Sequence, residues 1–159
     1  MIGIKCEITN RLRMAANRKI VKHTNIRIMR MKQITTNNKI NEKILHPELS
    51  YIITGILFSV HNELGQYARE KQYGDSIEAK LKEAKIPYKR ELAIASSGNI
   101  LDFVVDNKIV LELKSSRILT KGDYRQMQNY LQQTDIKLGI LVNFRPKYLK
   151  PVRIIRIDR

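Results

Sequence analysis

Residues 100–116, with the sequence ILDFVVDNKIVLELKSS, constrain the fold of this chain more than any other stretch. Two apolar segments, 100–105 and 109–114, lie on either side of the polar residues DNK. Short apolar segments joined by a polar turn are typical of a β-hairpin. Three charged side chains interrupt the two segments: Asp102, Glu112 and Lys114. We therefore predict a hairpin that carries a small group of charges.

The length of the turn decides whether the two carboxylates meet. Side chains alternate between the faces of a strand, so a change of one residue in the register moves a side chain to the other face. A two-residue loop would place Asp102 opposite Leu111. A three-residue loop, 106–108, would place Asp102 directly opposite Glu112, and Asn107 tolerates the left-handed backbone that such a loop needs. We predict the three-residue loop. The other face would then be a core face: Leu101, Phe103, Val105, Ile109, Leu111 and Leu113.

The charges of the hairpin indicate a metal site. Two neighbouring carboxylates on a half-buried sheet repel each other unless a cation neutralises them. Mg²⁺ and Mn²⁺ prefer such oxygen ligands. Lys114, which shares a face with Glu112, could hold a water molecule or a phosphate oxygen beside the ion, and this combination suits metal-assisted hydrolysis of a phosphodiester. The alternative is a structural ion pair between Asp102 and Lys114.

The charge of the chain points to a polyanionic partner. The 159 residues include 30 Lys and Arg against 15 Asp and Glu, a net charge of +15. Such an excess favours nucleic acid first and an anionic membrane second. Residues 1–43 hold 11 of the basic residues and 2 of the acidic ones. Much of the excess therefore belongs to the beginning of the chain and says little about the folded domain.

Two domains of different character are predicted. Residues 1–43 are basic, polar and without clear periodicity, and we expect a flexible N-terminal extension; an arm that follows nucleic acid is the alternative. Residues 44–159 are long enough for one domain with a core. The one cysteine, Cys6, excludes an intramolecular disulfide. No apolar run reaches transmembrane length and no signal peptide is recognised, so we expect a cytoplasmic protein.

Helical periodicity begins near His46. Apolar residues at helical spacing predict an amphipathic helix over 47–64, with Pro47 in its first turn and Gly65 as its C-terminal cap. A second helix is predicted at about 67–85, with Glu70 near its apolar stripe. A third is predicted at about 120–133, with Thr120 as its N-cap. Three further strands are expected in addition to the hairpin: 88–95, 136–144 and the edge strand 152–157.

The order of these elements predicts the fold class. A strand, a helix and another strand in succession imply a parallel pair joined by a right-handed crossover. The hairpin adds antiparallel strands. We therefore predict an α/β fold with a mixed β-sheet flanked by helices.

This order, with Asp102 and the triplet ELK at 112–114, resembles the core of the PD-(D/E)XK nuclease superfamily, and the resemblance implies a restriction-endonuclease-like fold. Residues 45–157 are also similar to the small bacterial and archaeal GxxExxY family. Besides the hairpin, the similar segments are GILFSVHNELG (55–65), REKQYGD (69–75), KIPYKRE (85–91), QMQNYL (126–131) and LGILVNF (138–144). Tyr67 stands where the name GxxExxY expects glycine, and Leu101 stands where the superfamily name expects proline.

The resemblance implies a metal-dependent nuclease site. Asp102 and Glu112 would be metal ligands, and the backbone carbonyl of Leu113 would be a further ligand. Lys114 would orient the attacking water or stabilise the transition state. Glu70 would be an accessory ligand or a base.

The resemblance also implies residues that contact the substrate. Gln126 would line the site together with Tyr130, one helical turn later, and both would contact the substrate backbone. Ordinary helix packing is the alternative for these two residues and for Glu70. Basic residues near the site could hold flanking phosphates, and this attraction would weaken with salt: Lys121, Arg125, Arg145 and Lys147.

The predicted function is therefore that of an Mg²⁺- or Mn²⁺-dependent nuclease, with DNA favoured over RNA as its partner and no membrane. The first alternative is a non-catalytic nucleic-acid-binding module that keeps the nuclease fold. The second is a structural protein in which the hydrophobic first helix forms a homodimer.

Overall fold

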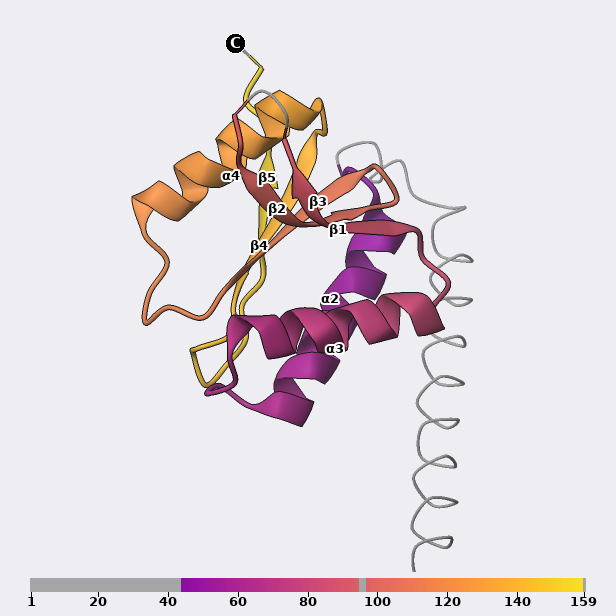
Figure 1. Ribbon diagram of the computed structural model, residues 1–159, viewed down its shortest axis with the longest axis vertical. Helices are drawn as coiled ribbons and strands as arrows, with labels where there is room; N and C mark the ends of the chain where they lie inside the picture. The colour runs from indigo at the N-terminus through magenta and orange to yellow at the C-terminus, as the bar shows by residue number, and fades with distance from the viewer. Residues whose placement is uncertain (1–43, 95–96, 159) are drawn as a thin grey trace, which may run out of the picture. The chain divides into compact units, whose positions relative to one another are not determined.

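A computed structural model of the chain describes residues 44–94 and 97–158 (Figure 1). The predicted extension, 1–43, lies outside the described residues. The described elements are α2 (Pro47–Leu64), α3 (Glu70–Glu83), β1 (Tyr88–Ala93), β2 (Ile100–Val105), β3 (Ile109–Lys114), α4 (Lys121–Thr134), β4 (Leu138–Asn143) and β5 (Val152–Ile155). None of the helices in this part of the chain is long and apolar enough to cross a membrane.

The five strands form one mixed sheet in the order β1-β2-β3-β4-β5. β3 and β4 are parallel and are joined through α4, whereas the other neighbouring strands are antiparallel. Helices α2 and α3 pack on one face of the sheet and α4 packs on the other (Figure 1). The predicted restriction-endonuclease-like α/β fold is confirmed, including β5 as an edge strand.

The helix boundaries follow local capping signals. α2 has the predicted limits, with Pro47 in the first turn and Gly65 at the C-cap, where φ is 69° and the N–H donates to the carbonyl of His61. α4 begins after Thr120, whose hydroxyl accepts a hydrogen bond from the N–H of Asp123. α3 begins later than predicted, because the hydroxyl of Tyr73 binds backbone groups of Gly65 and Ala68 in the preceding loop, and it also ends before the predicted limit.

The hairpin has the predicted register. Val105 pairs with Ile109, so the loop has three residues. The N–H of Lys108 donates to the carbonyl of Val105 at 3.0 Å. Both Asp106 and Asn107 adopt left-handed conformations, with φ of 52° and 50°. The sequence argument expected only one left-handed residue.

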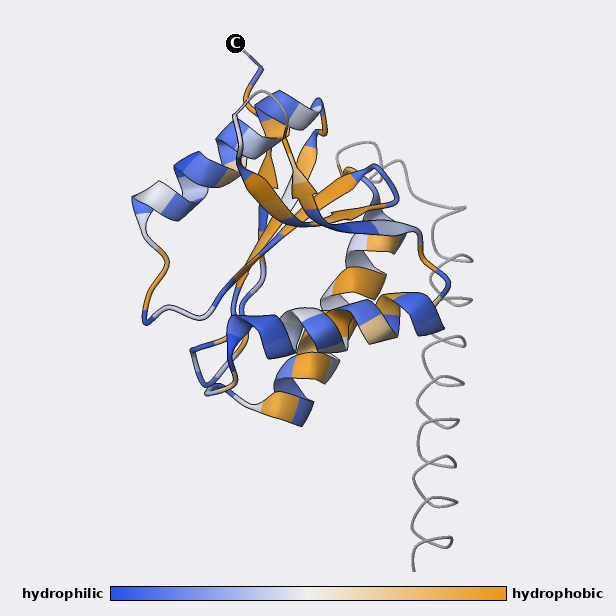
Figure 2. Ribbon diagram, viewed as in Figure 1, coloured by the Kyte–Doolittle hydropathy of each residue, from blue (hydrophilic) through white to orange (hydrophobic). Residues whose placement is uncertain are grey.

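The sheet separates two apolar layers, which Figure 2 shows as orange strands between the helices. The layer beneath α2 and α3 contains five residues of the predicted core face: Phe103, Val105, Ile109, Leu111 and Leu113. The sixth, Leu101, packs in the layer beneath α4 instead, which corrects the prediction. Side chains of β2 stop alternating between the two faces of the sheet at Asp102. At this level β1 and β2 are not paired: the pairs lie on either side of Glu91, whose own backbone is left-handed, with φ of 51°.

Candidate active site

The candidate site lies where β2 and β3 separate. Their pairing runs from Val105 and Ile109 to Phe103 and Leu111 and stops there. The next bond comes from a side chain: Oδ2 of Asp102 accepts a hydrogen bond from the N–H of Leu113 at 2.7 Å. Asp102 is therefore held against β3 at the level of Glu112, through a side-chain bond and not through the predicted ladder pair.

Glu112 and Lys114 share a face of β3, as predicted. Nζ of Lys114 lies 2.8 Å from Oε1 of Glu112. Glu112 is 4% exposed, and its other oxygen, Oε2, is buried without a hydrogen-bond partner among the described residues. The alternative ion pair between Asp102 and Lys114 is not formed in the described part of the chain. Instead, one oxygen of Glu112 remains available to a further ligand.

Burial and neighbouring carboxylates destabilise the charged forms of Glu112 and Asp102. Burial, and next the charge of Asp102, raise the pKa of Glu112 to about 7, although Lys114 opposes this shift. Burial also raises the pKa of Asp102; the Leu113 amide opposes the shift and the charge of Glu70 adds to it. Desolvation and like charges both disfavour ionisation. The site therefore holds more negative charge than Lys114 neutralises.

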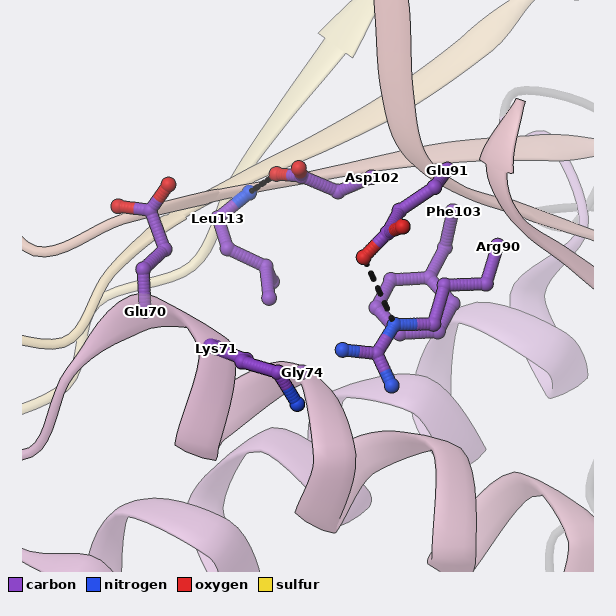
Figure 3. Close-up of a pocket in the computed structure, with 8 residues that line it drawn as sticks. All are labelled: Glu70, Lys71, Gly74, Arg90, Glu91, Asp102, Phe103 and Leu113. Atoms are coloured by element: carbon purple, nitrogen blue, oxygen red, sulfur yellow. Dashed lines mark hydrogen bonds and ion pairs between the residues drawn. The ribbon is translucent and has the colours of Figure 1, made fainter. Parts of the chain in front are cut away.

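Glu70, the first residue of α3, faces the same region. Its Oε2 accepts a hydrogen bond from the hydroxyl of Ser115, just after β3, at 3.2 Å. Figure 3 shows its carboxylate pointing toward Asp102 and Leu113. These residues line one pocket between α3 and the strands: Glu70, Lys71, Gly74, Arg90, Glu91, Asp102, Phe103 and Leu113.

Two pocket residues that the sequence analysis did not single out come from β1. Glu91 has a left-handed backbone and lines the pocket, and its charge is one of those that raise the pKa of Asp102. Arg90 pairs with Glu78 at 2.6 Å and with Asp75 at 2.7 Å, so it links β1 to α3. A Cβ at Gly74 would approach the Arg90 guanidinium to 3.0 Å, so the glycine leaves room for this arginine.

The predicted substrate-contacting residues lie on α4. Glu112 and Lys114 point to this face of the sheet, because Leu111 and Leu113 pack beneath α2 and α3 and side chains alternate along β3. The amide of Gln126 donates to the hydroxyl of Tyr130, which is buried. Burial raises the pKa of Tyr130, and the charges of Glu112 and Asp102 add to this, so the hydroxyl lies within electrostatic reach of the site. Lys121 and Arg125 lie on the same helix with exposed side chains, outside the group of hydrogen-bonded site residues.

The donor set is compatible with a hard divalent cation. Within the described ranges no three His, Cys, Asp or Glu side chains are arranged to hold a metal ion. Two carboxylates are nevertheless present, and one has a buried oxygen without a hydrogen-bond partner in the described part of the chain. Mg²⁺ is commonly bound by one or two carboxylates, with water and substrate phosphate completing its shell. Asp102 and Glu112 fit that arrangement.

Comparison with known proteins identifies a family. The family model of the PD-(D/E)XK nuclease superfamily matches residues 47–157, from the start of α2 to just beyond β5. No match is found among curated proteins or among solved structures. The match covers well over half of the chain and every described element, including the strands that carry Asp102, Glu112 and Lys114. The chain therefore belongs to the PD-(D/E)XK nuclease superfamily.

Proposed function

We propose that this protein is a metal-dependent nuclease that hydrolyses phosphodiester bonds in nucleic acid, with DNA as the preferred substrate. The observation that carries this proposal is the buried Oε2 of Glu112, which has no hydrogen-bond partner among the residues that the structure describes. The same side chain binds Lys114 and is affected by the charge of Asp102. A buried polar atom without a partner is costly unless a ligand satisfies it. We further propose that the protein is a GxxExxY family member, on the strength of the similar segments.

We propose Asp102 and Glu112 as the metal ligands, with the backbone carbonyl of Leu113 as a third. Mg²⁺ or Mn²⁺, when bound there, would supply an activated water and would neutralise charge on the scissile phosphate. Asp102 can contribute mainly Oδ1, because Oδ2 already accepts the Leu113 N–H. Glu112 can contribute Oε2, because Oε1 is bound by Lys114.

The remaining proposed roles follow from position and charge. Burial alone would lower the pKa of Lys114, but its hydrogen bond to Glu112 and the nearby negative charges together raise the pKa, so the ammonium group stays charged. It can donate a hydrogen bond to a phosphate oxygen or to the attacking water. Glu70 would act as an accessory ligand or base from the start of α3.

Substrate contacts are proposed for α4. Gln126 and Tyr130 would contact the substrate backbone. The charges of Glu112 and Asp102 contribute to the raised pKa of Tyr130, which supports a position of this hydroxyl near the site. Lys121 and Arg125 would hold flanking phosphates, because both are exposed cations on this helix. The proposed nuclease domain comprises residues 44–159.

The test is cleavage of labelled DNA by the full-length chain with Mg²⁺ or Mn²⁺, comparing the parent with Asp102→Asn. Asparagine keeps an oxygen that can accept the Leu113 N–H, so the fold is retained while the charge is lost. Asp106→Asn is the matched control, because Asp106 lies in the turn of the same hairpin and already has the left-handed backbone that asparagine tolerates. We expect Asp102→Asn to lose at least about 100-fold in rate and Asp106→Asn to cleave like the parent.

Two other outcomes have clear meanings. Equal cleavage by the parent and Asp102→Asn would refute the assignment of the site. If neither the parent nor the variants cleave DNA, and the parent binds nucleic acid equally with and without metal, the protein is a non-catalytic binding module, which is the alternative function. Calorimetry with Mn²⁺ gives an independent measure: the parent should bind about one ion per chain, and Asp102→Asn should bind none.

A further inference from the structure

Two loops beside the candidate site carry exposed tyrosines and basic residues but no acidic residue. The loop 65–69, GQYAR, joins α2 to α3, and the loop 144–151, FRPKYLKP, joins β4 to β5. Tyr67 is 77% exposed and Tyr148 is 78% exposed, the highest values among the large apolar side chains of the described residues. Each loop therefore presents an aromatic ring to solvent.

Cations lie over both rings. The guanidinium carbon of Arg145 is 5.5 Å from the ring centroid of Tyr67, in the other loop. Nζ of Lys147 is 5.5 Å from the ring centroid of Tyr148. The two loops are thus in contact, and each tyrosine has a positive charge next to it.

Buried contacts hold the two loops in place. The hydroxyl of Tyr73 donates to the carbonyl of Gly65 at 2.7 Å and accepts from the N–H of Ala68 at 3.2 Å. The Tyr73 ring stacks on Phe144, with centroids 4.1 Å apart. Phe144 and Leu149 are both buried and anchor the second loop near its two ends. The exposed tyrosines are therefore presented by a fixed scaffold.

The position of the loops links them to the candidate site. Loop 65–69 runs directly into Glu70, and the N–H of Phe144 donates to the carbonyl of Lys114 at 2.8 Å. Whatever binds to the loops therefore lies next to two residues proposed for phosphodiester hydrolysis.

An exposed aromatic ring beside a cation suits a nucleotide whose base is unpaired. The base stacks on the ring, and its phosphate contacts the cation. In a duplex the bases are stacked on one another, so the rings would contribute little and only the cations would act.

We propose that Tyr67 and Tyr148, with Arg145 and Lys147, form a stacking platform for an unpaired DNA strand, and that this platform selects single-stranded segments for the site. The role in selecting a substrate for cleavage rests on the proposed function. Binding to the platform does not require metal or cleavage, so the two proposals can fail separately.

The test is fluorescence anisotropy of the full-length chain with a labelled thymidine oligomer of about 20 nucleotides and with a duplex of the same length, in EDTA at near-physiological salt. The variants are Tyr67→Ala, Tyr148→Ala and their combination. Tyr51→Ala is the matched control, because Tyr51 is also an exposed tyrosine but lies on α2. Tyr67→Phe and Tyr148→Phe keep the stacking surface.

We expect each alanine variant to weaken binding of the single strand by about tenfold and the double variant by more, while duplex binding changes by less than about twofold. The phenylalanine variants and Tyr51→Ala should bind like the parent. Unchanged single-strand binding by the double alanine variant, or equal losses for single strand and duplex, would overturn the platform. Selective single-strand binding by a parent protein that does not cleave DNA with Mg²⁺ or Mn²⁺ would instead count against the proposed hydrolysis alone.

Discussion

Replacing Glu112 with glutamine should stabilise the metal-free protein at neutral and alkaline pH. Burial and the charge of Asp102 raise the pKa of Glu112 from its usual 4.5 to about 7. Between these two values the folded protein retains a proton that the unfolded chain has released, so the free energy of unfolding falls as the pH rises. Glutamine has no proton to lose, and this fall should disappear in the variant.

The size of the effect follows from the pKa shift and from the contacts that glutamine would make in place of Glu112. A shift of one pKa unit corresponds to about 1.36 kcal/mol. The free energy of unfolding of the parent should therefore fall by roughly 3 kcal/mol as the pH rises through the range between the two pKa values of Glu112. The pKa of about 7 already includes the opposing effect of Lys114. The gain is reduced instead because the NH₂ group of glutamine would stand where Oε2 has no hydrogen-bond partner among the described residues. The amide oxygen of glutamine can still accept the hydrogen bond from Lys114. We therefore expect Glu112→Gln to be more stable than the parent by about 1–3 kcal/mol at about pH 8, and nearly equal to it at about pH 4.5.

The assay is urea unfolding in EDTA at several pH values between these limits, with the full-length chain. Groups that titrate in both proteins contribute equally to the two free energies of unfolding. The difference between parent and variant at each pH therefore reports the titration of Glu112. Glu83→Gln, at an exposed glutamate at the end of α3, is the matched control for the change of glutamate to glutamine. A Glu112→Gln variant that is less stable than the parent at about pH 8, or a difference that does not change with pH, would refute the reasoning.

Two further predictions concern elements that position the site. Thr120→Ala removes the acceptor for the N–H of Asp123 at the start of α4, and should lower the free energy of unfolding by about 1 kcal/mol in urea titrations; Thr120→Ser should restore it. Hydrogen bonds from Tyr88, Lys82 and Arg90 lower the pKa of Glu78 to about 2, so its stabilisation is present above pH 4.5 and is lost as the pH falls toward 2. Glu78→Gln should therefore be less stable than the parent at neutral pH, and acid titration followed by circular dichroism should show the difference vanishing across that window; a difference that persists at the acid end would contradict this account.

The parts of the fold that depend on nearby residues could be predicted from the sequence. α2 has its predicted limits because Pro47 and Gly65 act on the backbone next to them. The hairpin register follows from the length of its turn, which a few residues determine. The charged group of β2 and β3 was predicted for the same reason, since both strands belong to one hairpin.

The remaining features depend on contacts between distant residues. The backbone conformation of Glu91 accompanies a gap in the pairing of β1 with β2, opposite a carboxylate that is bound to β3, and no local pattern in β1 indicates it. The same gap moves Leu101 to the other apolar layer. The late start of α3 depends on the hydroxyl of Tyr73, whose ring stacks on a residue after β4. These pairings only exist once the sheet has formed.

The hydrogen bond from Leu113 to Asp102 has a consequence for how sequences of this kind can change. Here a side chain serves as the acceptor that a backbone carbonyl would normally supply within a sheet. A chain that no longer needed the negative charge would still need an acceptor at this position, or leave the amide unsatisfied. Among relatives that have lost hydrolysis, asparagine should therefore replace this aspartate more often than alanine or an apolar residue does. Aspartate itself can also persist there for this structural reason after hydrolysis is lost, so its presence alone is weak evidence of activity, and the glutamate and lysine of β3 are more informative.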